Sequence, residues 1–238
     1  MIEFHRVSKK YGETAALADF SLTVPTSKIT VLMGLSGSGK TTIIRMVNKM
    51  VSPTSGSVSI DGLDVADRDA VALRRTVGYV MQEVGLLPHK TVLENVTLIA
   101  RIAGQPAEVA RDNATEMLTM VGIDEQSFGR YPQQLSGGQQ QRVGVARALA
   151  IKPNILLMDE PFGAVDPIVR EELQDELCRI QRELGLTIIF VTHDRHEAIT
   201  IADQLVVLSN GGHIEQSGAP SDLTEKPASA FVRKLLGV

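Results

Sequence analysis

The stretch Gly34-Leu35-Ser36-Gly37-Ser38-Gly39-Lys40-Thr41 decides the fold of this chain. An apolar run at residues 29–33 precedes it and a helical pattern at residues 41–49 follows, as in a turn between a strand and a helix. Glycines let such a turn curl until its backbone N–H groups surround a phosphate. The stretch therefore predicts a phosphate-binding loop, and the alternative is an ordinary turn of glycine and serine. The candidate nucleotide contacts are Gly34, Ser36, Gly37, Ser38, Gly39, Lys40, Thr41 and Thr42.

The composition narrows the class of protein. The 238 residues suffice for one large domain, and a hydrophobic share of 43% argues against disorder. A net charge of −4 without a basic tract argues against nucleic acid as the main partner. Cys178 is the single cysteine, which excludes an intrachain disulfide and fits a reducing cytoplasm. We expect neither a signal peptide nor a membrane span, because the apolar runs are far shorter than the roughly 20 residues that a membrane helix needs.

Short apolar segments alternate with amphipathic ones, which predicts an α/β fold with a doubly wound sheet. The expected strands are rich in β-branched residues, as in parallel strands that are covered on both faces. They lie at residues 29–33, 77–81, 155–158, 187–192 and 205–209. The clearest helix covers residues 169–184 and ends at Gly185.

Two regions interrupt this alternation. Residues 1–28 and 56–65 predict short strands of a small antiparallel sheet. Residues 91–150 are mostly helical in pattern and predict a helical subdomain inserted into the core. One helical face before Gly122 is expected to hold Val109, Ala110, Ala114, Met117, Leu118 and Val121. We therefore expect a single domain over residues 1–238, with the core at about 1–90 and 151–238 and the helical part at about 91–150.

Polar side chains follow three of the expected strands. Asp159 and Glu160 end one, His193 and Asp194 follow another, and Gln82 follows a third. Because parallel strands present their carboxyl ends to a ligand crevice, we expect these side chains near the phosphate loop. A carboxylate such as Asp159 can hold Mg²⁺ there, directly or through water.

Each of these positions has a simpler interpretation. Asp159 and Glu160 could be solvated acids at a strand end, and Gln82 an ordinary loop residue. His193 could be a structural histidine, or could share a metal ion with His196.

The run Leu135-Ser136-Gly137-Gly138-Gln139 lies between the phosphate loop and the acidic strand end. Serine and two glycines before a helical pattern form a helix N-terminus that can bind an anion, and the alternative is an ordinary serine N-cap. The three motifs together resemble those of the ATP-binding-cassette ATPases. The resemblance implies a P-loop NTPase (RecA-like) core with a small antiparallel β-subdomain and an inserted α-helical subdomain. It also implies a homodimer that sandwiches ATP, with this run contacting the nucleotide of the second copy.

The resemblance assigns functions to single residues. It implies that Glu160 polarises the attacking water, that His193 binds the γ-phosphate, and that Gln82 senses Mg²⁺ and water. It implies that Tyr11 stacks on adenine, and the alternative is a tyrosine packed against an edge sheet. Mg²⁺ contacts are implied for Thr41, Gln82 and Asp159, and nucleotide contacts in the second copy for Ser136, Gly137, Gly138 and Gln139. The run Ala164-Val165-Asp166 fits the loop that crosses the dimer interface.

Within the family, the details resemble importers of quaternary amines and related osmoprotectants. The stretches that carry this resemblance include Arg45-Met46-Val47-Asn48, Gly85-Leu86-Leu87-Pro88-His89 and Pro161-Phe162-Gly163-Ala164. The resemblance implies transmembrane permease subunits, an indirect substrate-binding protein, and a peripheral position on the cytoplasmic face of the inner membrane. The alternatives are a cassette ATPase of lipid trafficking or export, and a soluble cassette ATPase without a transport function.

Overall fold

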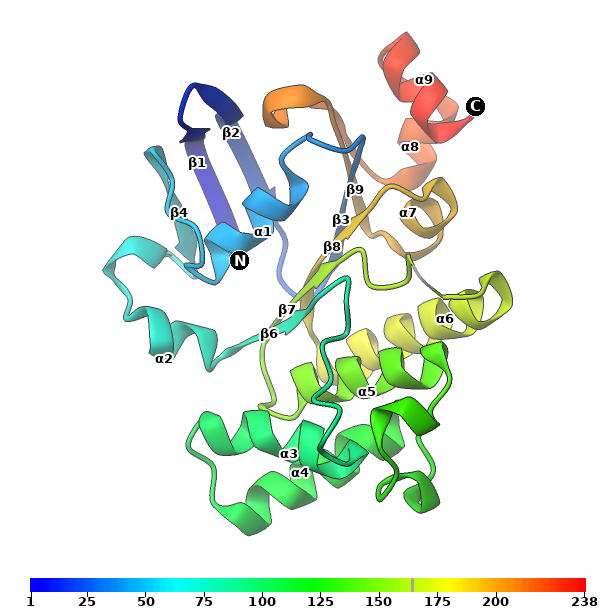
Figure 1. Ribbon diagram of the computed structural model, residues 1–238. Coiled ribbons are helices and arrows are strands. Elements are labelled where there is room, and N and C mark those ends of the chain that lie inside the picture. The colour runs from blue at the N-terminus through cyan, green and yellow to red at the C-terminus, as the bar shows by residue number, and fades with distance from the viewer. Residues whose placement is uncertain (164) are drawn as a thin grey trace. The chain divides into compact units, whose positions relative to one another are not determined.

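The computed structural model describes residues 1–163 and 165–238, which divide into two compact units (Figure 1). The first unit comprises Met1–Arg74 and Thr187–Val238, and the second comprises Arg75–Leu186. Among the described residues, no helix combines the length and the hydropathy that are needed to cross a bilayer. The expected division into a core and an inserted helical subdomain stays a prediction.

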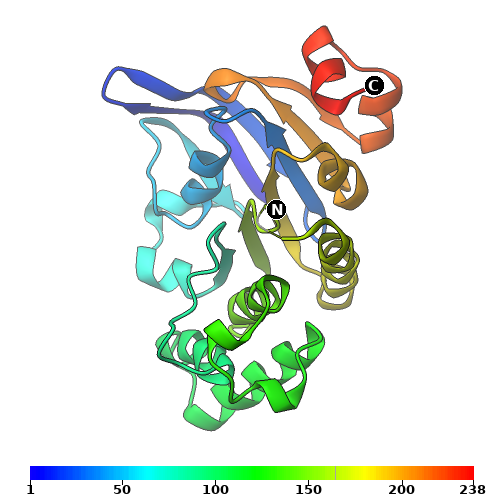
Figure 2. The ribbon, with the colours of Figure 1, turned by 45° about the vertical axis from the view of Figure 1, so that its right-hand side comes forward.

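An antiparallel sheet in the first unit is built from the N-terminal segments, as expected. Its order is β2 (Thr14–Val24), β1 (Ile2–Tyr11), β4 (Ser55–Ile60) and β5 (Leu63–Asp64). Figure 2 shows β1 and β2, drawn in blue, as a long hairpin. Its buried face includes the rings of Phe4 and Phe20, which pack edge to face with their centroids 5.3 Å apart.

Parallel strands in the same unit carry the apolar runs. Strand β3 (Ile29–Gly34) lies between β8 (Thr187–Thr192) and β9 (Gln204–Leu208), parallel to both. Every residue of β3 and β8 is buried, which explains why neither shows polar alternation. Strand β10 (Ile214–Gly218) pairs antiparallel with β9, and it was not predicted because its sequence is mostly polar.

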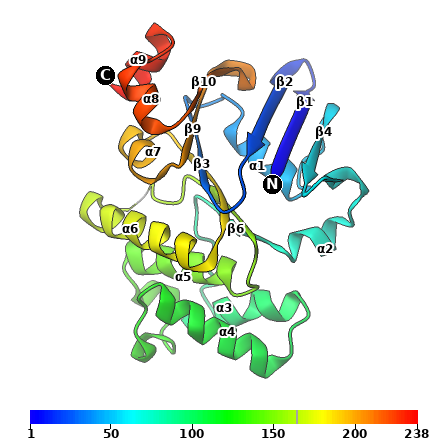
Figure 3. The same ribbon diagram turned by 180° about the vertical axis from the view of Figure 1, so that it is seen from behind.

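The helices of the first unit are short, and Figure 3 shows the C-terminal ones beside β9 and β10. Helix α1 ends at Val47, before the expected Lys49, because Lys49 has a φ of 55° and leaves the helical region. The helices are α1 (Lys40–Val47), α2 (Ala70–Arg74), α7 (Arg195–Ile201), α8 (Pro220–Glu225) and α9 (Ala230–Leu236).

The described residues of the second unit form two parallel strands and four longer helices. The strands are β6 (Val77–Val80) and β7 (Ile155–Asp159). The helices are α3 (Val92–Ile102), α4 (Ala107–Met120), α5 (Gly137–Leu149) and α6 (Pro167–Leu184). The expected apolar face of α4 is buried except for Val109, which is 46% exposed. Including Val109 in that face was wrong, because Ala110 already fills the buried position at that turn.

Candidate functional site

The phosphate loop connects β3 to α1 and is closed by its own lysine. The Nζ atom of Lys40 donates to the carbonyl oxygens of Gly34 at 2.8 Å and Leu35 at 2.9 Å. The Lys40 side chain is buried, while Ser36 and Gly37 are exposed at the rim of the loop. The backbone of the loop is therefore already curled around a positive charge, as binding of a phosphate requires.

A residue with a Cβ atom does not fit at Gly39. Its φ is 90°, and a Cβ atom would lie 2.6 Å from Cδ2 of Leu17 and 2.8 Å from the carbonyl oxygen of Ala16. Gly39 is also the N-cap of α1, and it provides no side chain to cap the first N–H groups. The start of a helix favours an anion, and the half-buried Thr41 and Thr42 lie in this first turn.

His193 leaves the sheet next to the phosphate loop. Met33 of β3 pairs with Thr192 of β8, so Gly34 and His193 follow neighbouring parallel strands at the same edge. The His193 side chain is exposed, which argues against a buried structural histidine. Within residues 1–163 and 165–238, no group of three or more His, Cys, Asp or Glu side chains is placed to hold a metal ion. The alternative of a metal site at His193 and His196 therefore has no support.

Tyr11 ends β1, with its ring available to a ligand. The side chain is 52% exposed, and Nζ of Lys9 lies 5.1 Å from the ring centroid. A half-exposed ring with a cation on it can stack on a base, although its contact with adenine stays a prediction.

The acidic strand end in the second unit has an unusual backbone. Asp159 ends β7, is 8% exposed, and accepts a hydrogen bond from the Tyr79 hydroxyl at 3.4 Å through Oδ2. Glu160 follows with a φ of 47°, a left-handed conformation that is uncommon outside glycine. Such conformations cluster at functional sites, where the surrounding structure holds them in place.

Gln82 reaches the same edge as the two acids. Val80 of β6 pairs with Met158 of β7 in parallel, and Gln82 and Glu160 each lie two residues beyond this pair. Gln82 is exposed and Glu160 is half-buried. Sequence reasoning missed Tyr79, whose position inside a strand shows no sign of contact with an acid elsewhere in the chain.

The signature run, defined here as Leu135 to Gln139, is the N-terminus of α5. Ser136 is the N-cap, and its Oγ accepts from the Gln139 N–H at 3.2 Å while the Gln139 side chain accepts from the Ser136 N–H at 3.0 Å. This capping box uses the N–H of Gln139, while the N–H groups of the first turn before it have no intrahelical acceptor. Gly137 is exposed, and a Cβ atom there would meet no packed neighbour within 4 Å, whereas a Cβ at Gly138 would lie 2.6 Å from Cγ1 of Val169.

The segment after Gln82 is attached to α5 and α3. Arg147 donates to the carbonyl oxygens of Val84 and, at 2.7 Å, of Gly85. Burial lowers the pKa of the Arg147 guanidinium, which still stays charged at any ordinary pH. Asn95, 1% exposed, accepts from the Leu87 N–H at 2.7 Å and donates to its carbonyl oxygen at 3.1 Å. Nothing local in the sequence marks these two anchors, because both contacts depend on the fold.

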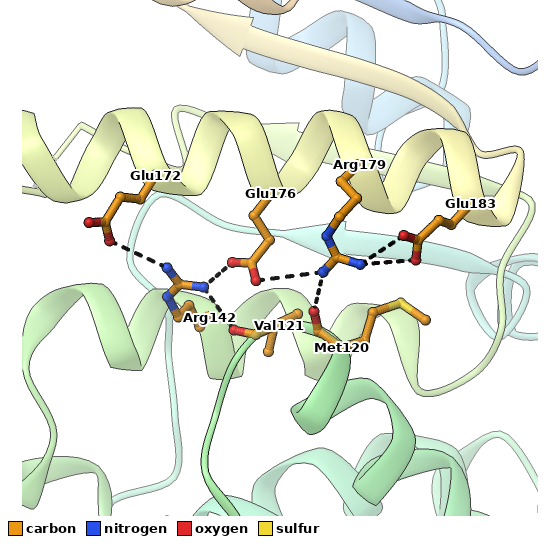
Figure 4. A network of polar contacts seen from close by, with 7 residues as sticks. All are labelled: Met120, Val121, Arg142, Glu172, Glu176, Arg179 and Glu183. Carbon is orange, nitrogen blue, oxygen red and sulfur yellow. Dashed lines mark hydrogen bonds and ion pairs between the residues drawn. The ribbon is translucent and has the colours of Figure 1, made fainter.

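An ion-pair network joins α5 to α6 and to the end of α4 (Figure 4). Arg142 of α5 donates to Glu176 of α6 and, at 2.9 Å, to the carbonyl oxygen of Val121. Arg179 donates to the carbonyl oxygen of Met120 at 2.6 Å. The same α6 begins after Asp166, whose Oδ1 caps it by accepting from the Ile168 N–H at 3.0 Å. Ala164, in the run before Asp166, lies outside the described residues.

The predicted site residues therefore form two groups, one in each unit. The first unit holds the phosphate loop, Tyr11 and His193, and the second holds Gln82, Asp159, Glu160, the signature run and Asp166. In a comparison with known protein families, the model of the ABC transporter family matches residues 17–163. The chain belongs to the ABC transporter family. That match covers the phosphate loop, Gln82, the signature run and the acidic strand end, and it leaves out Tyr11, Asp166 and His193.

Individual relatives agree with this assignment. The carnitine transport ATP-binding protein OpuCA of Listeria monocytogenes is 44% identical over 238 residues, covering 100% of this chain and 60% of that protein. The glycine betaine uptake system ATP-binding protein YehX of Escherichia coli is 44% identical over 237 residues, covering 100% of this chain and 77% of that protein. The resemblance to osmoprotectant importers is thereby confirmed, while the chain spans about three fifths of the length of the OpuCA proteins.

A solved structure confirms the fold class. The ATP-binding cassette MJ0796, in a dimeric post-hydrolysis state with ADP and Pi, has a TM-score of 0.82 and 35% identity. The comparison covers 92% of this chain and 99% of that one. The expected α/β cassette fold is therefore correct.

Proposed function

We propose that this chain is the ATP-hydrolysing subunit of a bacterial importer for a small quaternary amine such as glycine betaine, choline or carnitine. The observation that carries the proposal is the exposed, capped N-terminus of α5 at Ser136, in a chain whose phosphate loop is already closed around Lys40. Two anion-binding helix starts, one with the lysine and one without, fit a nucleotide that is held between two copies of the chain. The names of the relatives supply the substrate class.

ATP binding is assigned to the first group of residues. The phosphate loop and Lys40 hold the phosphates, Tyr11 stacks on the base, and His193 contacts the γ-phosphate. The donor set for Mg²⁺ consists of Thr41, Gln82 and Asp159, all with the oxygen ligands that this ion prefers. Bound Mg²⁺ supplies neutralising charge on the phosphate oxygens.

Glu160 is assigned to the water that attacks the γ-phosphate. A positioned carboxylate accepts a proton or hydrogen bond from that water, and the left-handed backbone of Glu160 aims the side chain differently from a continuing strand. The signature run completes the shell of donors around the γ-phosphate from the second copy. Asp166 belongs to the same interface in this proposal.

The membrane partner is assigned to the segment Gly85 to His89, which receives a short helix of a permease subunit. Leu86 and Leu87 are half-buried, while Pro88 and His89 are exposed. Hydrogen bonds to Arg147 and Asn95 fix the backbone of the segment. Next to it, α3 and α4 border a groove of about 490 Å³ whose lining includes Lys90, Leu93 and Thr97. An anchored apolar segment beside a groove suits a docked helix. The chain would then act on the cytoplasmic face of the inner membrane, with substrate choice left to the permease and its binding protein.

Hydrolysis is tested by phosphate release at saturating Mg-ATP. Glu160→Gln should abolish turnover and keep nucleotide binding, because the amide has the same shape but does not accept a proton. Glu83→Gln, which neutralises an exposed acid near Gln82, is the matched control and should keep wild-type turnover. Equal turnover of the Glu160→Gln variant and the wild type would remove Glu160 from its role.

The transport class is tested in cells that lack osmoprotectant uptake. The chain and the permease genes beside its own should restore uptake of radiolabelled glycine betaine, carnitine or choline at high osmolarity, and the Glu160→Gln version should not. A crosslinker at His89→Cys in a Cys178→Ala background should capture the permease, and one at the exposed Asp175→Cys should not. ATP turnover without uptake of any quaternary amine would favour a cassette of another transporter class.

A further inference from the structure

Hydrogen bonds hold the chain on both sides of His193, in the turn between β8 and α7. Thr192, the last residue of β8, accepts from the backbone N–H of Asp194 through Oγ1 at 2.9 Å. The same hydroxyl donates to Oε2 of Glu197 at 2.5 Å. Thr192 and Glu197 are 2% and 3% exposed, so both bonds lie away from solvent. The hydroxyl therefore links the residue after His193 to an acid one turn along the next helix.

Asp194 completes this arrangement from the other direction. Its Oδ1 accepts from the N–H of His196 at 2.7 Å and from the N–H of Glu197 at 3.3 Å, which makes it the N-cap of α7. Thr192, Asp194 and Glu197 are thus linked to one another by hydrogen bonds. The exposed side chain of His193 projects from between Thr192 and Asp194.

The chemistry of a hydroxyl explains why threonine is needed at residue 192. A hydroxyl has one proton and can accept through its lone pairs. Because the Asp194 N–H occupies an acceptor position, the proton is directed to Glu197, and the hydroxyl uses both functions at once. Hydrogen bonds from hydroxyl to carboxylate are among the strong ones in proteins, so the torsion of this turn is tightly defined.

We propose that Thr192 and Glu197 are positioning residues that fix His193 relative to the phosphate loop. The inference rests on the proposed function, in which His193 contacts the γ-phosphate. Met33 pairs with Thr192, so the loop and the histidine leave adjacent strands at that pair. Without these hydrogen bonds, the backbone between Thr192 and Asp194 could rotate and displace the imidazole ring of His193. The phosphate loop, which follows another strand, would stay unchanged. The effect should therefore fall on the rate of hydrolysis and not on ATP affinity.

The test compares Thr192→Val, which keeps the shape and removes the hydroxyl, with Thr192→Ser, which keeps the hydroxyl. Single-turnover hydrolysis of radiolabelled Mg-ATP by the purified chain measures rates over several orders of magnitude. Thr192→Val should slow hydrolysis roughly 10- to 100-fold with unchanged ATP affinity, since small misplacements of a catalytic group have effects of this order. Thr192→Ser should stay within about twofold of wild type, because it keeps the hydroxyl bond. Glu197→Leu removes the acceptor of that bond and should slow hydrolysis in the same way as Thr192→Val. If Thr192→Val does not fold, Thr192→Ala removes the same hydroxyl.

A double-mutant cycle separates positioning from simple support of the fold. In a His193→Ala background, Thr192→Val should have no further effect on the rate, because the residue that it positions is gone. An equal loss in both backgrounds, or no loss in either, would overturn the inference. A wild-type rate for His193→Ala alone would instead contradict the proposed role of His193, and a wild-type chain without hydrolysis would contradict the proposed function.

Discussion

Lys40 and Lys49 both donate hydrogen bonds from Nζ to two backbone carbonyl oxygens of the first unit, but only Lys40 does so inside the phosphate loop. Lys40 donates to two carbonyl oxygens inside the phosphate loop, at 2.8 Å and 2.9 Å. Lys49 donates to the carbonyl oxygens of Ala66 and Arg68, both at 2.6 Å, away from that loop. The two side chains therefore form a matched pair for mutation.

Lys40→Met should weaken ATP binding by roughly tenfold or more, because hydrogen bonds to a charged group are each worth about 1.5–3 kcal/mol. Lys49→Met loses the same number of carbonyl contacts, so it should lower the unfolding midpoint without changing ATP affinity. A fluorescent ATP analogue measures the affinity and thermal unfolding measures the stability. Equal loss of ATP affinity in both variants would contradict a specific function for Lys40.

At the scale of elements, the first turn of α5 contains an exposed glycine, Gly137, next to a packed one, Gly138. Gly137→Glu places a carboxylate at the positive end of the helix, where it should leave the unfolding free energy unchanged or raise it by about 0.3–1 kcal/mol. The same charge should abolish ATP-driven dimerisation, because it occupies the place of a phosphate. Sizing of the chain in the Glu160→Gln background with ATP measures this association.

Two controls accompany Gly137→Glu. Gly137→Gln has nearly the same size without the charge and should still dimerise. Gly138→Ala should instead destabilise the monomer, because its Cβ would meet Val169. Dimerisation of the Gly137→Glu variant at the wild-type ATP concentration would exclude an anion site at this helix.

The network between α5 and α6 makes stability depend on pH in a defined direction. Burial raises the pKa of Glu176 from its usual value of 4.5, and this effect outweighs the opposing charges of Arg142 and Arg179. A carboxyl that is protonated more readily in the folded state lowers stability as the pH rises from 4.5 through the folded pKa. Glu176→Gln has no such charge, so its unfolding free energy relative to wild type should improve between pH 4 and pH 7. Urea unfolding at both pH values measures the difference, and a relative loss toward pH 7 would contradict the sign.

The same elements show what the sequence could predict. The α5 N-terminus was predictable because serine, two glycines and glutamine form a local capping pattern. The strands β3 and β8 were predictable because burial on both faces gives each of them a continuous, mostly apolar run. The contact of Gly138 with Val169, the exposure of Val109 and the left-handed Glu160 were not, because each depends on how distant segments pack. The motifs thus indicated the candidate site residues, and packing determined their surroundings.

At the scale of the whole molecule, the proposed function gives each chain two half-sites. The phosphate loop belongs to the first unit, and the signature run belongs to the second. If the signature run acts on the nucleotide of a second copy, each complete site needs both chains. Lys40→Met removes the phosphate half and Gly137→Glu removes the signature half, so neither variant should hydrolyse ATP alone.

Mixing the two variants should restore part of the activity. In a mixed dimer, the intact loop of one chain meets the intact signature of the other, and the second site carries both defects. Each mixed dimer has one intact site of two, so independent sites of a symmetric dimer would give at most about half of wild-type turnover. If the phosphate loop and the signature run of the same chain formed a site together, the mixture would have no turnover, because every site would then contain one of the two substitutions. If the mixture has no turnover, sizing of the two variants in the Glu160→Gln background shows whether a mixed dimer forms. A mixed dimer without turnover means that the two sites act together. The absence of both the mixed dimer and turnover contradicts the sandwich.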